Sequence, residues 1–189
     1  ITERVYAEIS GENGGNIGAI ILDDQVVIVD AGMSHTLTTK TKEEIEFITD
    51  LPITHLLLTH NHSDHLFGIQ AFEPINVISS KDTSDIISNL MKESWSSKEL
   101  EKYTDEVKEE RPELARSLRS LEVHEPDTVF AKSMRLGKHN ELLIEKMGGH
   151  TMGSSILTFE DESTIFAVDL IFANMFPYAG DPTNNPDEW

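Results

Sequence analysis

Cysteine is absent from this sequence, and its absence excludes disulfide bonds and thiolate metal ligands. Long apolar runs are also missing, since none approaches the roughly 20 residues that a membrane-spanning helix requires. No signal peptide is visible at the start of the chain, which begins with Ile1. These absences lead us to expect a cytoplasmic protein with no membrane partner.

Basic residues are scarce: 15 lysines and arginines against 34 aspartates and glutamates give a formal net charge of -19. A chain this acidic repels nucleic-acid phosphates, and no local basic patch reverses the repulsion. Nucleic acid is therefore not an expected partner. The 189 residues, 38% of them hydrophobic, are enough for one sizeable core, so we expect a single domain over residues 1–189.

One stretch dominates what the sequence does contain. Residues 60–65 hold three histidines and one aspartate, directly after the apolar residues 56–58. Imidazole and carboxylate groups bind zinc, manganese and iron, and in an extended segment His60 and His62 point to the same side. Single histidines near strands are usually packed or solvated, but four such groups buried here without a metal would leave polar atoms unpaired. We therefore predict a metal-binding loop.

The hydrophobic pattern predicts strands and helices on both sides of this loop. We expect strands at residues 4–10, 17–22, 26–29, 53–58, 76–79, 128–131, 134–136, 142–147, 156–159 and 164–168. Helices are expected at residues 42–51 and 66–72. The second helix would place Asp64 and His65 near a helix N-terminus.

A charged segment over residues 82–121 is predicted to form a helical insertion. Apolar side chains recur at helical spacing over residues 86–91 and 100–107, and Pro112 suits the start of a third helix. Such apolar faces usually pack against the core. A second interpretation is that the insertion covers the metal loop and shapes a substrate entrance, or that it makes a homodimer contact.

Three more candidates lie far from the histidine-rich loop in the sequence. Asp30 and Asp169 each follow an apolar strand, and His150 lies in a glycine-rich stretch that lets the backbone turn sharply. Taken alone, Asp30 is typical of a turn or capping aspartate. The order of these residues along the chain is more informative than any one of them.

Together the motifs form a pattern: a strand and Asp30, then His-x-His-x-Asp-His at residues 60–65, then Gly-His-Thr-x-Gly-Ser at residues 149–154, then a strand and Asp169. This pattern resembles the metallo-β-lactamase-fold hydrolase superfamily, in its general metal-dependent hydrolase branch. The resemblance implies an αββα sandwich, in which two mixed sheets lie face to face with helices outside and a metal site at one edge.

The resemblance also implies a role for each motif residue. Three histidines would hold a first metal ion, a bridging aspartate would join it to a second, and one buried aspartate would orient the loop by hydrogen bonding. The implied first-metal ligands are His60, His62 and His150, the second-metal ligands are Asp64 and His65, the bridge is Asp169, and the orienting residue is Asp30. A sixth ligand, a histidine some tens of residues after Asp169, is expected; none follows His150, so we expect that the last strand and helix are missing.

The implied activity is hydrolysis of a small ester-, thioester-, lactone- or amide-like substrate by a metal-bound hydroxide. Asp64 would be the catalytic residue that orients the nucleophile and exchanges its proton. One or two zinc ions are expected, with iron or manganese left open. Two alternatives also stay open: an iron-dependent sulfur dioxygenase on the same fold, and a non-catalytic member with an incomplete second metal site.

Overall fold

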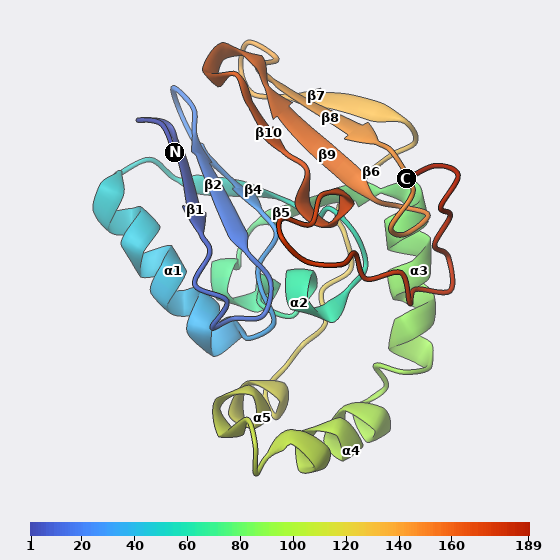
Figure 1. Ribbon diagram of the computed structural model, residues 1–189. Helices are drawn as coiled ribbons and strands as arrows, with labels where there is room; N and C mark the ends of the chain where they lie inside the picture. Colours follow the sequence, from blue (N-terminus) through green and yellow to red (C-terminus); the bar gives the residue numbers. More distant parts are fainter.

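Two β-sheets face each other in the computed structural model, which describes residues 1–189 (Figure 1). The first sheet has six strands, in the spatial order β1 (Val5–Glu8), β2 (Ile17–Ile21), β3 (Val26–Val29), β4 (Ile53–Leu57), β5 (Asn76–Ser80) and β6 (Thr128–Phe130). Strands β1 to β3 pair antiparallel, whereas β3 to β6 pair parallel. This sheet is mixed, as predicted.

The second sheet has four strands, in the order β10 (Thr164–Phe166), β9 (Ser155–Phe159), β8 (Leu142–Lys146) and β7 (Ser133–Leu136). All of its pairs are antiparallel, so the prediction of two mixed sheets is wrong for this one. The physical reason is its connectivity: each strand turns back through a short loop onto its neighbour, whereas parallel pairs need a longer crossover.

Strand β3 shows how the sequence builds a core on each face of the first sheet. All four of its residues are buried. Val26 and Ile28 join the apolar cluster that lies between this sheet and the helices, and Val27 and Val29 join the cluster that lies between the two sheets. Because successive side chains of a strand point to opposite faces, one unbroken valine and isoleucine run serves both cores.

All five α-helices lie on the side of the first sheet, and the second sheet carries no α-helix on its outer face (Figure 1). Helix α1 (His35–Ile48) begins seven residues earlier than predicted, because Ser34 caps it by accepting a hydrogen bond from the Leu37 N–H. The helix predicted over residues 66–72 is divided into α2 (Ser63–Leu66) and a 3-10 turn (Ile69–Phe72). Asp64 and His65 lie within α2.

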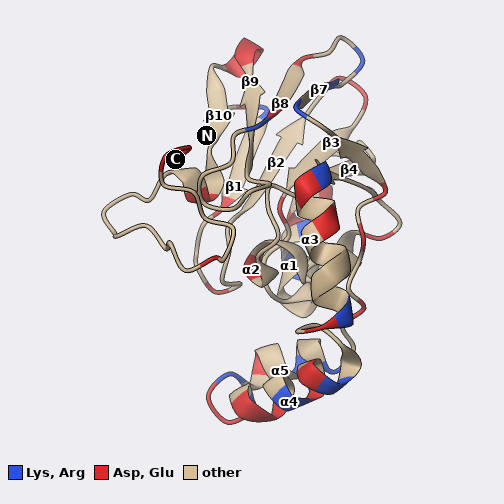
Figure 2. Ribbon diagram, turned by 90° about the vertical axis from the view of Figure 1, so that its right-hand side faces the viewer, with Lys and Arg blue, Asp and Glu red and all other residues tan.

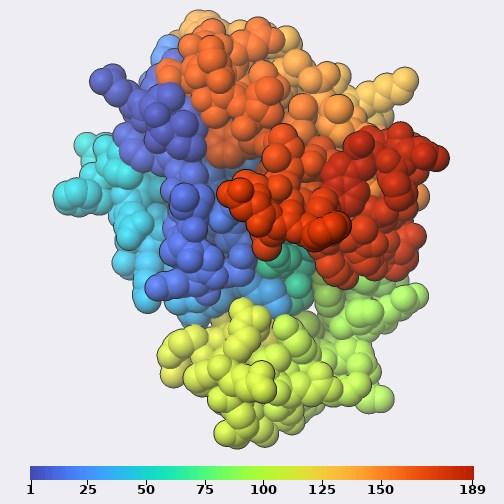
Figure 3. All heavy atoms as spheres, in the orientation of Figure 1, coloured from blue at the N-terminus to red at the C-terminus, as the bar shows by residue number.

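The three helices predicted within residues 82–121 are confirmed as α3 (Lys81–Lys92), α4 (Ser97–Val107) and α5 (Pro112–Leu118). Helix α3 packs against β5 and β6, and α4 packs against α5. The α4–α5 pair forms a lobe below the sheets (Figures 1 and 3). No helix is both long and apolar enough to cross a membrane.

The chain returns from this helical lobe to the sheet at Asp127. Its backbone N–H donates to the Val77 carbonyl oxygen at 2.8 Å, and its side-chain Oδ2 accepts from the Val77 N–H at 2.8 Å. Burial opposes ionisation of Asp127, but the hydrogen bonds from Val77 and His124 outweigh it and hold the pKa below the usual value of 3.8. The ionised carboxylate therefore stabilises the junction of β5 and β6.

We predict that Asp127→Asn lowers the free energy of unfolding by about 0.5 kcal/mol near neutral pH, because the site is partly solvated. A lowered folded-state pKa stabilises the protein above the unfolded-state pKa, so the difference from wild type should shrink as the pH falls below about 4 toward the lower folded-state pKa. Urea unfolding at pH 7 and pH 3.5 measures it. Asp24→Asn, in the exposed β2–β3 turn, is the control; a difference at Asp127 that is as large at pH 3.5 as at pH 7 would contradict the assignment.

Candidate metal centre

Asp30 anchors the histidine-rich loop at the carboxyl end of the first sheet. Strands β3 and β4 are parallel neighbours, so Asp30 and Thr59 emerge side by side. The Asp30 carboxylate accepts three hydrogen bonds: from the Thr59 N–H at 2.8 Å, the Thr59 hydroxyl at 2.7 Å and His65 Nδ1 at 2.8 Å. Asp30 has a φ of 58°, a conformation that surrounding structure must hold in place for a non-glycine residue. These three bonds supply that restraint.

Three imidazole nitrogens converge beside this anchor. His60 Nε2 lies 3.1 Å from His62 Nδ1, and His62 Nδ1 lies 3.0 Å from His150 Nε2. Two of the rings come from the loop after β4, and the third comes from the loop between β8 and β9. Zn–N bonds of about 2.0–2.1 Å at tetrahedral angles would place such nitrogens about 3.3 Å apart. The observed spacing fits one divalent cation bound by all three rings.

The second nitrogen of each ring faces an oxygen atom that fixes the ring. The pairs are His60 Nδ1 with the Thr59 hydroxyl at 3.1 Å, His62 Nε2 with Asp181 Oδ2 at 3.0 Å, and His150 Nδ1 with the Tyr178 carbonyl oxygen at 3.0 Å. Such partners select the tautomer that leaves the inward nitrogen free to bind a metal. The orientation of the rings is therefore set by the protein itself.

Asp181 was not among the residues predicted from the sequence. Burial opposes its ionisation, but hydrogen bonds from Thr183 and His62 outweigh this and lower its pKa, so it faces His62 as a carboxylate. Asp181 lies in a turn between Gly180 and Pro182, where an aspartate is commonplace. No spacing in the sequence connects this turn to His62, 119 residues away.

Asp169 lies between two parts of the cluster. Its Oδ2 is 3.5 Å from His150 Nε2, and its Oδ1 is 3.5 Å from His65 Nε2. It was predicted at the tip of a strand, but it lies in a short 3-10 turn (Val168–Leu170) that follows β10. Asp64 approaches the same nitrogen, with Oδ2 at 3.5 Å from His65 Nε2 and 41% of its side chain exposed. The carboxylates therefore line the open side of the histidine cluster.

The electrostatics of His60 and His65 are opposite. Burial and the neighbouring imidazoles of His65, His62 and His150 lower the pKa of His60 well below its usual value, so this ring is neutral and its inward lone pair is free. Burial also acts to lower the pKa of His65, but the carboxylates of Asp30, Asp64 and Asp169 outweigh it and raise the pKa to about 9. The neighbouring carboxylates therefore determine the direction in which the pKa of His65 is shifted.

Two groups of side chains have ligand atoms close enough to hold a metal ion: His60, His62, His150 and Asp169 form one, and Asp30, His60 and His65 form the other. The second group is better explained as a hydrogen-bonded support for the histidine-rich loop, because the Asp30 oxygens already accept three protein hydrogen bonds. The remaining histidines lie outside both groups, as expected: His35, His55, His124 and His139 contact other partners.

A network of buried hydroxyls holds the His150 loop. The Gly153 carbonyl oxygen accepts from Ser80 Oγ at 2.8 Å, Ser155 Oγ at 2.9 Å and Thr83 Oγ1 at 3.2 Å. The Ser155 N–H donates to the Thr59 carbonyl oxygen at 3.0 Å, which joins the loop to the histidine-rich segment. A Cβ atom on Gly153 would lie 2.2 Å from Thr83 Oγ1 and 2.6 Å from the Thr83 backbone nitrogen. Only glycine fits this contact.

We predict that Gly153→Ala weakens zinc affinity by at least about tenfold, because the backbone contact with Thr83 forces the His150 loop to shift. Competition with a chromophoric chelator measures the affinity. Gly11→Ala is the control: unlike Gly153, Gly11 has a positive φ, 77°, but a Cβ there meets no atom within 4 Å. It should lower stability while leaving zinc affinity unchanged. Equal zinc affinity in wild type and Gly153→Ala would show that this contact does not position His150.

Comparisons with known proteins agree with this architecture. The profile of the metallo-beta-lactamase superfamily matches residues 10–188, whereas the search of curated proteins finds no match. The metallo beta lactamase from Hirschia baltica is 16% identical, with a TM-score of 0.63 over 95% of this chain and 72% of that one. FIM-1 from Pseudomonas aeruginosa, in a mono-zinc form, is 15% identical, with a TM-score of 0.68 over 97% of this chain and 73% of its own. At these identities the solved structures show that the fold is shared. Because the family profile matches nearly the whole sequence, the chain belongs to the metallo-beta-lactamase superfamily.

Proposed function

We propose that the protein is a metal-dependent hydrolase of a small ester-, thioester-, lactone- or amide-like substrate. The observation that carries the proposal is the convergence of three imidazole nitrogens at 3.0–3.1 Å, each ring held by an oxygen partner on its far side. Membership of the superfamily supports it. Zinc is the first candidate metal, because FIM-1 has been solved in a mono-zinc form and imidazole is a preferred zinc ligand.

The residues divide into two sets of ligands. His60, His62 and His150 would hold the first cation, while His65 and Asp64 would contribute to a second, with Asp169 between them. A divalent cation in such a site lowers the pKa of the water that it binds and polarises a carbonyl oxygen. The first set contains three imidazole rings, whereas the second contains one, that of His65, which also donates to Asp30 at 2.8 Å. We therefore infer that the first set binds metal more tightly.

Asp64 is the best-placed group for proton transfer. Its side chain is 41% exposed at the open side of the cluster, whereas Asp30 is 1% exposed and already accepts three hydrogen bonds. A carboxylate at this position can orient an attacking water, take its proton and return the proton to the leaving group.

No nucleophilic side chain is required. The sequence has no cysteine, and the Ser154 hydroxyl is buried in the His150 loop, where it accepts a hydrogen bond from the Thr151 N–H at 2.9 Å. Direct attack by water therefore suits the groups that are present better than a covalent intermediate on the protein does.

We predict that Asp64→Asn lowers kcat by about 100-fold, because a positioned general base contributes on that order. The three histidines are unchanged, so one metal ion per chain should remain. Hydrolysis of a panel of small esters, thioesters and lactones, with elemental analysis of the same samples, measures both. Asp161→Asn, in the turn between β9 and β10, is the control. An Asp64→Asn enzyme with the wild-type rate would refute the assigned role.

We also predict that His150→Ala loses bound metal and hydrolytic activity together, whereas His139→Ala, at an exposed position, retains both. Removal of metal with a chelator should abolish hydrolysis in the wild type, and added zinc should restore it. Elemental analysis and the hydrolysis assay give the result. A single iron per chain, with oxygen consumed during turnover, would instead favour a dioxygenase.

A further inference from the structure

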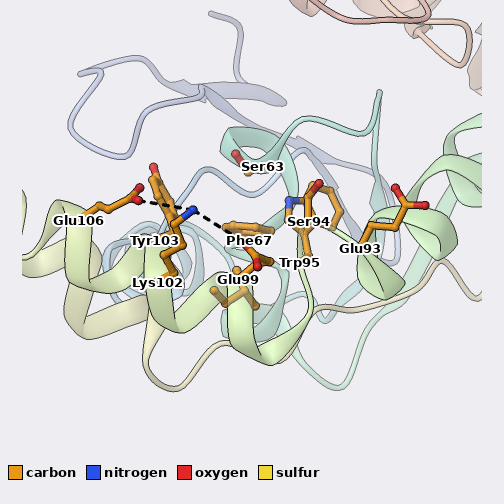
Figure 4. Close-up of a pocket in the computed structure, with 10 residues that line it drawn as sticks. Ser63, Phe67, Glu93, Ser94, Trp95, Glu99, Lys102, Tyr103 and Glu106 are labelled. Atoms are coloured by element: carbon orange, nitrogen blue, oxygen red, sulfur yellow. Dashed lines mark ion pairs between the residues drawn. The ribbon is translucent and has the colours of Figure 1, made fainter.

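A cleft of about 630 Å³ opens directly beside the histidine-rich loop, between α2 and residues 93–106 of the helical lobe (Figure 4). Its rim includes Ser63, the residue between His62 and Asp64. Cavities of about 300–1,000 Å³ are typical of small-molecule sites. The cleft therefore has a suitable size, and it begins at the loop that carries two of the converging imidazoles.

One wall of the cleft is aromatic. Phe67 and Trp95 pack edge to face, with ring centroids 5.2 Å apart and planes at 70°, and Tyr103 and Leu100 extend the surface along α4. Figure 4 shows the Phe67 and Trp95 rings together at the centre of the cleft, below Ser63. Phe67 is itself 2% exposed, so Trp95 and Tyr103 supply the accessible aromatic surface. Aromatic faces carry negative charge density that attracts cations.

The remaining lining is acidic. Three glutamates and one lysine line the cleft, so its formal charge is 1 − 3 = −2. Lys102 is engaged with Glu99 at 4.0 Å and Glu106 at 3.9 Å, which leaves Glu93 without an ion pair. Glu93 and Glu106 lie at opposite ends of the cleft in Figure 4, and acidic residues are also prominent on the surface of α4 in Figure 2.

We propose that this cleft is the substrate-binding site for an ester, thioester or amide that carries an alkylammonium group. The carbonyl would lie at the histidine cluster, and the cationic group would lie between the aromatic wall and the unpaired Glu93. This proposal rests on the proposed hydrolase function, because it names the substrate class for that same site. Ser63 belongs to the histidine-rich loop and to the rim of the cleft, so the cleft lies next to the residues that would hold the metal.

Charge argues for this occupant over an anionic or neutral one. The single cation of the cleft is shared by two carboxylates, so a negatively charged group would meet an excess of negative charge. The chain as a whole carries a formal charge of -19, which raises the local concentration of cations and repels anions. A neutral group would gain the apolar contacts alone.

Binding can be tested apart from hydrolysis with benzyltrimethylammonium and its neutral isostere neopentylbenzene. Isothermal titration of the zinc-loaded protein should show that the cation binds at least about fivefold more tightly, and the double variant Glu93→Gln/Glu99→Gln should remove most of this preference. Glu101→Gln, a charge on α4 that does not line this cleft, is the matched control and should change nothing. Equal binding of both compounds to the wild type would overturn the proposal.

Hydrolysis kinetics distinguish the substrate role of the cleft from the hydrolase function itself. Acetylcholine should be hydrolysed with a KM at least about fivefold below that of 3,3-dimethylbutyl acetate, its neutral isostere. The double variant should raise the KM for acetylcholine more than the KM for the neutral ester, whereas Glu101→Gln should change neither. Hydrolysis of both esters with equal KM would overturn the cleft assignment but leave the hydrolase function standing. Cation binding in the cleft without hydrolysis of any ester, thioester, lactone or amide would overturn the hydrolase function, and with it the substrate role of the cleft.

Discussion

The structure of the site depends on one buried carboxylate, that of Asp30. Its two oxygens accept the backbone N–H and hydroxyl of Thr59 and the Nδ1 of His65. These contacts fix both ends of the histidine-rich loop, and the Thr59 hydroxyl in turn faces His60 Nδ1. Without Asp30, several buried donors would lose their partner, at a cost of about 1–3 kcal/mol each. The strained backbone of Asp30, at φ 58°, is maintained by the same bonds.

The two sheets contribute different halves of the cluster. The parallel strands of the first sheet deliver Asp30, His60, His62 and His65 at their carboxyl ends, and the antiparallel second sheet delivers His150 and Asp169 from its loops. An apolar cluster between the sheets holds these strand ends in fixed relative positions. Its side chains include Val29, Leu57, Ile144 and Leu157, which are fully or almost fully buried. The hydrogen bond from Ser155 to Thr59 joins them next to the histidines.

Local patterns in the sequence predicted the strands of the first sheet, the three helices α3, α4 and α5, and the clustering of the motif residues. These features depend on side-chain periodicity and on ligand types placed close together, which a sequence displays directly. The early start of α1 was missed because its cap, Ser34, precedes a threonine-rich turn with little apolar periodicity. Asp181 was missed because its contact with His62 exists only after the segment that follows Asp169 folds across the site. The antiparallel pairing of the second sheet likewise depends on connectivity rather than on residue pattern.

We propose that His60, His62 and His150 bind one metal ion through the nitrogens that converge in the structure. X-ray absorption spectroscopy at the zinc edge, on protein loaded with one zinc ion per chain, tests it most directly. We predict three imidazole nitrogens at about 2.0–2.1 Å from the zinc ion, together with the outer-shell scattering of three histidine rings. A first shell of oxygen atoms alone, or failure of the protein to retain one zinc ion, would contradict it.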